Sequence, residues 1–204
     1  MIVAGRVETL LYMIFSSGIA IFVDWQAYSD ANYVSGSKYL KNIVDFVMGY
    51  VLLGGMIRNG RLGNGERPGF GSYFGIAILS GLGILLGFVF LIIPGVFLMV
   101  RWAPAYGYAM AEDSGVMVAL ERSFRDTEPH ATPILVCQMA YVGLFFVGLA
   151  IYALSEFFDP ELLWFSTVGG NIILSASLVV SAAIGLAVYS LLNQSPEALT
   201  DVFE

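Results

Sequence analysis

Three long stretches of this sequence contain no Asp, Glu, Lys or Arg, namely residues 68–100, 131–155 and 162–196. The hydrocarbon core of a bilayer is about 30 Å thick, and about 20 helical residues are needed to cross it. Each stretch is long enough for at least one crossing. Because backbone amides find no water inside lipid, such stretches form helices. We therefore expect an all-α, polytopic membrane bundle.

The composition of the chain agrees with this class and excludes several others. Of its 204 residues, 58% are hydrophobic and 12% are charged, whereas a typical soluble domain has about 25% charged residues. The net charge is −7 and the sequence contains no basic stripe, so we expect no nucleic-acid partner. With one cysteine, Cys137, and one histidine, His130, a disulfide or the usual zinc site cannot form within one chain. We expect no metal or cofactor, and we interpret Cys137 as a small apolar packing residue.

Six crossings fit the sequence. We expect a single transmembrane domain over residues 1–194, with spans at about 8–25, 38–57, 72–92, 96–111, 132–154 and 163–192, an interfacial helix at 114–126 and an acidic cytoplasmic tail at 195–204. The break between the third and fourth spans is expected at Ile93-Pro94-Gly95, because proline disfavours helix at the residue before it and glycine tolerates a tight turn. One long bent helix is the alternative at this point.

The positions of the basic residues predict the orientation. With the amino terminus inside, Lys38 and Lys41 lie outside, whereas all six arginines outside the expected spans face the cytoplasm. Short cytoplasmic loops carry the excess of Lys and Arg in membrane proteins. We therefore expect both termini on the cytoplasmic side of a bacterial inner membrane, with membrane lipids as partners.

Two charged residues, Arg101 and Asp45, fall inside the expected spans at nearly the same depth from the outer face. Ionisable groups within a membrane usually find a partner, so an ion pair between spans two and four is one prediction. The alternative is that Arg101 reaches the outer headgroups and Asp45 binds Lys41, one turn earlier. Pro104 follows closely, and a broken helix beside a buried charge is an arrangement that transporters use. A simple kink in span four is the other interpretation of Pro104.

Small residues recur every four positions along two spans, and the spacing lets helix backbones approach closely. In span three these are Gly71, Gly75, Gly83 and Gly87, with Leu79 at the intervening position, and in span six they are Ser177, Ser181 and Gly185. The sequence leaves open whether these seams pack within one chain or between subunits of a homodimer.

The segment after span four is amphipathic. Val116, Met117, Leu120 and Phe124 are expected on one helical face and Glu121, Arg122 and Arg125 on the other. Such a helix lies on a membrane surface.

Residues 92–127 resemble the central signature of a bacterial family of six-span inner-membrane proteins. The family resembles the membrane domain attached to some glycerophosphodiester phosphodiesterases and includes related uncharacterised stand-alone membrane proteins. The matching positions are Pro94, Gly95, Arg101, Trp102, Glu112, Ala119, Leu120, Arg122, Ser123 and Phe124. After Phe124, the acidic Asp126 and Glu128 replace the more basic continuation of the family. The resemblance implies the fold and carries no hydrolytic activity, because the sequence holds no soluble phosphodiesterase domain.

The sequence is compatible with three classes of function. The expected one is a non-enzymatic accessory or membrane-organising protein, with another membrane protein or a second copy as partner. The alternative is a transporter or channel component for a small solute or lipid, with a polar site near Arg101, Asp45 and Pro104. A lipid enzyme would need a catalytic acid near Glu112 or near Glu156, and neither place offers a nucleophile or metal partner in the sequence.

Overall fold

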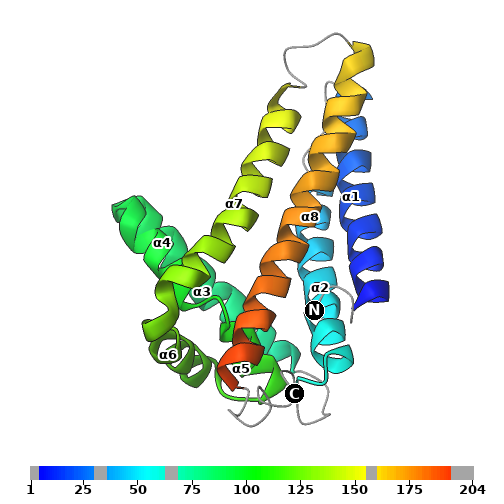
Figure 1. Ribbon diagram of the computed structural model, residues 1–204. Coiled ribbons are helices and arrows are strands. Elements are labelled where there is room, and N and C mark those ends of the chain that lie inside the picture. Colours follow the sequence, from blue (N-terminus) through cyan, green and yellow to red (C-terminus); the bar gives the residue numbers. More distant parts are fainter. Residues whose placement is uncertain (1–4, 30–35, 63–68, 155–159, 194–204) are drawn as a thin grey trace, which may run out of the picture. The chain divides into compact units, whose positions relative to one another are not determined.

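The computed structural model describes residues 5–29, 36–62, 69–154 and 160–193, and every regular element in these ranges is helical (Figure 1). The elements are α1 (Arg6–Ser29), α2 (Gly36–Asn59), α3 (Phe70–Phe90), α4 (Ile92–Arg101), α5 (Ala105–Ala111), α6 (Val116–Asp126), η1 (Glu128–His130), α7 (Ala131–Ala153) and α8 (Pro160–Asn193). The expected all-α class is confirmed. The predicted acidic tail lies outside the described residues.

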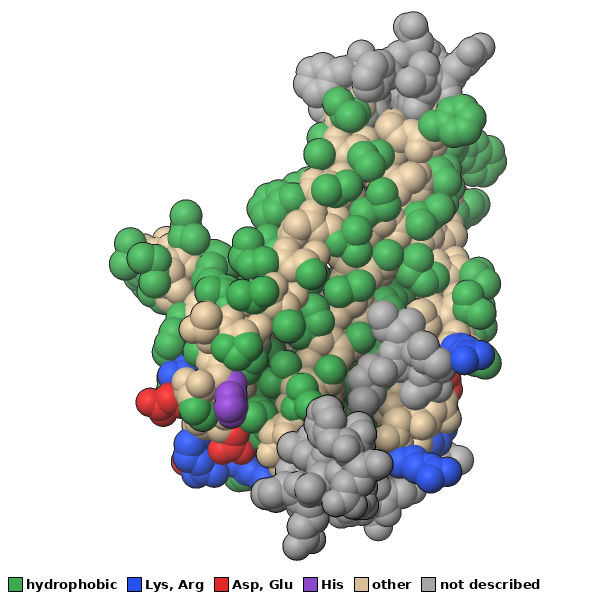
Figure 2. All heavy atoms as spheres, in the orientation of Figure 1, with side chains coloured by type: hydrophobic (Ala, Val, Ile, Leu, Met, Phe, Trp, Pro, Cys, Tyr) green, Lys and Arg blue, Asp and Glu red, His purple; other side chains and the backbone are tan. Residues whose placement is uncertain are grey.

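Five of the described helices, α1, α2, α3, α7 and α8, are long and apolar enough to cross a membrane. Their ends agree with five of the expected spans to within four residues. Large apolar side chains point outward along them, and Figure 2 shows the hydrophobic surface that results. Val89 and Phe90 of α3, for example, are 71% and 76% exposed. Hydrophobic surface of this extent indicates contact with lipid rather than water.

The fourth expected span, 96–111, is not one continuous helix. Helix α4 has ten residues and α5 has seven, and a turn at residues 102–104 separates them. At about 1.5 Å per residue, the two pieces are about 15 Å and 10 Å long. Neither piece crosses a bilayer alone, so the described helices do not confirm a count of six spans.

The chain breaks between α3 and α4 at Leu91, earlier than the expected position at residues 93–95. Leu91 is extended, with φ −161° and ψ 141°, and its N–H donates to the carbonyl of Gly87 at 3.0 Å. Pro94 is the third residue of α4, where a helix has no internal partner for an N–H group. Proline therefore fits inside the first turn and does not need to precede the helix.

Helices α3 and α4 form an antiparallel hairpin, seen side by side in Figure 1. Gly87 lies against Gly95 close to the turn, and Gly83 lies against the ring of Trp102 further from it. The further a contacting pair lies from Leu91, the more residues separate its two members in the sequence. This pattern shows that the chain reverses direction at Leu91. The alternative of one long bent helix is therefore wrong.

The chain divides into two compact units. Unit 1 contains residues 56–138 and the chain from residue 182 onward, and unit 2 contains residues 2–55 and 139–181. Unit 1 thus holds α3 to η1, the first turns of α7 and the last turns of α8. Unit 2 holds α1, most of α2 and the remaining parts of α7 and α8.

In unit 2, glycines bring α7 and α8 close together. A methyl group added to Gly170 would lie 2.8 Å from Cβ of Tyr152, and one added to Gly148 would lie 3.0 Å from the backbone nitrogen of Leu174. Polar side chains join α1 to α8 in the same unit, where the hydroxyls of Ser16 and Ser175 are 3.1 Å apart. Hydrogen bonds of this kind hold helices together in a membrane.

Candidate functional site around the helix break

The candidate site in unit 1 begins at the break between α4 and α5. Pro104 has no N–H, so it cannot continue the hydrogen bonding of α4. The carbonyl of Val100 accepts the N–H of Ala103 at 3.4 Å instead, and the carbonyl of Trp102 accepts the N–H of Ala105 at 3.1 Å. The arrangement is thus a broken helix and not a bend in a continuous one.

Helix α6 closes the break from outside. The Ser123 hydroxyl donates to the carbonyl of Arg101 at 2.7 Å, and the Thr127 hydroxyl lies 3.3 Å from the same oxygen. Both hydroxyl residues are fully buried. A buried carbonyl without a partner costs about 1–3 kcal/mol. These hydrogen bonds therefore explain why the helix can break here without a water molecule to satisfy the carbonyl of Arg101.

The side chain of Arg101 is buried beside α6, with 8% of the residue exposed. One terminal guanidinium nitrogen donates to the carbonyl of Phe124 at 3.2 Å. The guanidinium carbon lies 5.0 Å from the ring centre of Phe97 and 4.9 Å from that of Phe124. A desolvated cation over an aromatic ring gains about 2 kcal/mol. The Nε atom is buried and finds no hydrogen-bond partner among the described residues.

Asp45 has a local partner in unit 2. Lys41, one turn earlier on α2, donates to its carboxylate at 2.5 Å. This contact is the one expected in the alternative interpretation of the sequence. The ion pair with Arg101 stays a prediction, because Arg101 belongs to the other unit.

The other residues singled out in the sequence pack around the α3–α4 hairpin. The ring of Trp102, at the end of α4, packs on Gly83. Gly95 lies against the ring of Phe88, because a Cβ added to Gly95 would be 2.5 Å from the Cγ atom of Phe88. Pro94 and Pro104 stand at the start of α4 and directly before α5. These residues shape the backbone around Arg101 and do not gather into a polar pocket with it.

A second polar cluster, which the sequence did not reveal, joins α5, α6 and α8. The carboxylate of Glu112 accepts hydrogen bonds from Arg122 and from the Tyr189 hydroxyl, the latter at 3.0 Å. The Tyr108 hydroxyl donates to Asp126 at 2.8 Å, and the ring of Tyr108 lies 4.7 Å from the Arg122 guanidinium carbon. We call these five residues the tyrosine–carboxylate cluster. Their separation in sequence, from 108 to 189, gave no spacing signal.

The pKa of Arg122 reflects its place in this cluster. Partial burial lowers the pKa of the guanidinium, whereas the hydrogen bond and the negative charge of Glu112 raise it, and the net effect is a raised pKa. Arg122 therefore keeps its positive charge, and its ion pair with Glu112 connects α6 to the end of α5. Among the described residues, no group of three His, Cys, Asp or Glu side chains could hold a metal ion.

Helix α6 differs from the sequence expectation at its start and on its faces. It begins at Val116 after Gly115, because the Ser114 hydroxyl donates to the carbonyl of Tyr108 at 2.7 Å and does not cap the helix. The buried face consists of Ala119, Leu120 and Ser123, whereas Met117 is 69% exposed. Of the expected apolar face, Leu120 is therefore buried in the protein, whereas Met117 points outward.

Comparison with protein-family models, with curated proteins and with solved structures found no match for this chain.

Proposed function

We propose that this protein is an integral protein of a bacterial inner membrane that works without catalysis, as an accessory or membrane-organising subunit. The observation that carries the proposal is the closure of the helix break. The freed carbonyl of Arg101 binds Ser123 and Thr127, and the Arg101 side chain binds Phe124. A transporter of the broken-helix type uses such groups to bind its substrate, whereas here protein groups bind the carbonyl and one terminal nitrogen of the guanidinium.

The proposal includes a sixth crossing made of two short helices, with both termini cytoplasmic. Successive residues after Leu91 contact successively earlier residues of α3. Gly95 contacts Gly87, Trp102 contacts Gly83, and Val116 at the start of α6 contacts Gly75. Near the start of α3, a methyl group on Gly69 would lie 3.5 Å from the carboxylate of Asp113. The chain thus returns to the end from which α3 started. The resemblance of residues 92–127 to six-span membrane proteins supports the same count.

Helix α6 is the surface through which we propose that a partner acts. Its outward face combines the exposed apolar side chains of Met117 and Val118 with charged residues of both signs. Amphipathic helices of this kind lie in the headgroup region, where they can contact another membrane protein laterally.

The proposal is tested by crosslinking in cells together with reconstitution. A photoreactive amino acid at Met117 should crosslink to a discrete membrane protein, whereas the same group at Leu82, an exposed residue of α3, should react with lipid and give no discrete band. Purified protein in liposomes should not conduct small solutes. Flux of a solute that is lost in R101L but retained in R101K would overturn the accessory function and favour transport.

A further inference from the structure

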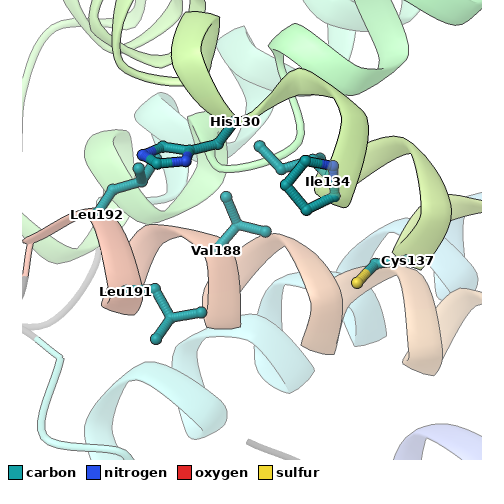
Figure 3. Close-up of a pocket in the computed structure, with 7 residues that line it drawn as sticks. His130, Ile134, Cys137, Val188, Leu191 and Leu192 are labelled. Atoms are coloured by element: carbon teal, nitrogen blue, oxygen red, sulfur yellow. The ribbon is translucent and has the colours of Figure 1, made fainter.

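An apolar groove lies in unit 1 between the start of α7 and the end of α8. Its volume is about 310 Å³, and it is lined by His130, Pro133, Ile134, Cys137, Val188, Leu191 and Leu192. Figure 3 shows side chains of the two segments around one space, with His130 and Leu192 towards one end and Cys137 towards the other. Cys137 lies seven positions after His130, which is about 10 Å along a helix.

The lining selects an apolar ligand. Of its side chains, only the imidazole of His130 is a strong hydrogen-bonding group, and it stands at one end of the groove. Water in a cavity needs two to four polar partners, so the rest of the groove does not hold it well. A polar solute would also find nothing to orient it along most of this length.

The position of the groove determines where its ligand comes from. Both lining helices are candidate membrane spans, and His130 directly precedes α7. In Figure 2 the histidine, in purple, lies close to charged side chains, with hydrophobic surface beside it. The groove therefore starts at the polar boundary and runs into the apolar part of the helices. Leu191 is 65% exposed and Cys137 is also exposed, so the groove is accessible from the side that faces hydrocarbon.

We propose that this groove is a binding site for one acyl chain of a membrane phospholipid, with the headgroup at the His130 end. Cys137 is exposed in the groove wall and is not the packing residue that the sequence suggested. The inference rests on the proposed membrane location, and it is independent of the accessory role and of any partner at α6.

The single cysteine allows a test on protein that is already folded. The chain is purified in mild detergent from membranes that contain phosphatidylethanolamine and phosphatidylglycerol, and native mass spectrometry counts retained phospholipid. About one phospholipid per chain is expected. Reaction of Cys137 with a bulky maleimide should then fill the groove and remove this lipid. The matched control is a C137S/V136C chain, since Val136 is 66% exposed one residue away and does not line the groove.

A second measurement uses phosphatidylcholine with a photoreactive group on the acyl chain. Crosslinks should concentrate in residues 130–137 and 188–192, and L191W should reduce them while V136W leaves them unchanged. Equal labelling of the exposed side chains of α3, or lipid retention that survives the Cys137 adduct, would overturn the site. Resistance of the same protein to extraction from membranes at high pH reports the membrane location separately, so the two failures can be told apart.

Discussion

Gly87 and Gly95 lie back to back across the α3–α4 hairpin, so close that a methyl group on Gly87 would stand 2.8 Å from the Cα and the nitrogen of Gly95. The atoms in the way belong to the backbone, so a side-chain rotation cannot relieve the contact. The two glycines therefore determine how closely α4 packs on α3, and with it the position of Arg101 at the end of α4.

Substitution of Gly87 by valine should separate the two helices. Overpacking of this kind costs about 1–3 kcal/mol, which should appear as a lower midpoint of thermal unfolding in detergent. The matched control is Gly81 in the same helix, where an added Cβ meets nothing within 4 Å. G81A should be neutral or slightly stabilising, because alanine favours helix by about 1 kcal/mol over glycine. Equal losses in G87V and G81V would contradict close packing at this point.

Removal of the hydroxyl of Ser123 should destabilise unit 1 more than removal of that of Thr127. Ser123 is 2.7 Å from the carbonyl of Arg101, whereas Thr127 is 3.3 Å from it and also donates to the carbonyl of Ser123 at 2.7 Å. We expect S123A to cost about 1–3 kcal/mol and T127V to cost less. Denaturant unfolding measures both. V118A, on the exposed face of the same helix, is the control, and an equally large loss there would refute the role of the hydroxyl.

The interaction between Glu112 and Arg122 should be measurable but modest. Their side chains are 27% and 33% exposed, and ion pairs near the surface contribute up to about 1 kcal/mol. A double-mutant cycle with E112Q and R122Q should give a coupling energy of that order. R125Q is the control, because the side chain of Arg125 is 66% exposed and its contact with Asp126 is 3.4 Å long. A coupling energy near zero would mean that Tyr189 alone holds Glu112.

Single cysteines in a C137S background should report the path of the chain through the membrane. We expect R61C, E128C and N193C to be protected from an impermeant maleimide in intact cells, and L154C to react, since α7 ends close to Leu154. The decisive position is residue 128, because it follows α4 and α5, the two short helices proposed to make the sixth crossing. Reaction of both E128C and N193C, with protection of L154C, would show that α4 and α5 do not cross and that the chain has five spans.

Asp24 should depend on its neutral partners on α7 and α8. The Tyr152 hydroxyl donates to it at 3.1 Å and the amide of Asn171 donates at 2.8 Å. Because N171L leaves the carboxylate with one donor fewer in a partly buried place, we expect a loss of about 1–3 kcal/mol. Y152F should lose less, since its bond is longer. D24N keeps the shape of the side chain and one of the two acceptor oxygens, so it should lose less than D24L in the same unfolding assay.

The long helices could be predicted from the sequence because their information is local. Uncharged runs of sufficient length identify α3, α7 and α8 without knowledge of their neighbours. The same runs also identified small residues at four-residue spacing, and the contacts of Gly75, Gly83 and Gly87 now place that seam of α3 within one chain.

The details around Arg101 could not be predicted in the same way, because they depend on residues distant in sequence. Pro94 predicts a turn, yet a proline in the first turn of a helix, where the structure places it, has the same local sequence. An arginine inside a membrane span predicts an acidic partner, whereas the contacts of Arg101 with Phe97 and with the carbonyl of Phe124 have no sequence pattern. The interaction of Tyr189 with Glu112 spans 77 positions, and no sequence pattern marked it.

The seven residues of α5 have a consequence for how the molecule is made. Six of them are buried, and α8 packs against this part of the chain. Tyr189 of α8 packs on Gly107, and a Cβ added to Gly185 would lie 2.5 Å from the carbonyl oxygen of Ala103, in the turn before α5. Helix α8 leaves the ribosome after α5. Helix α5 must therefore wait for α8, and a nascent polypeptide that stops short of residue 185 would expose α5 to membrane proteases and chaperones.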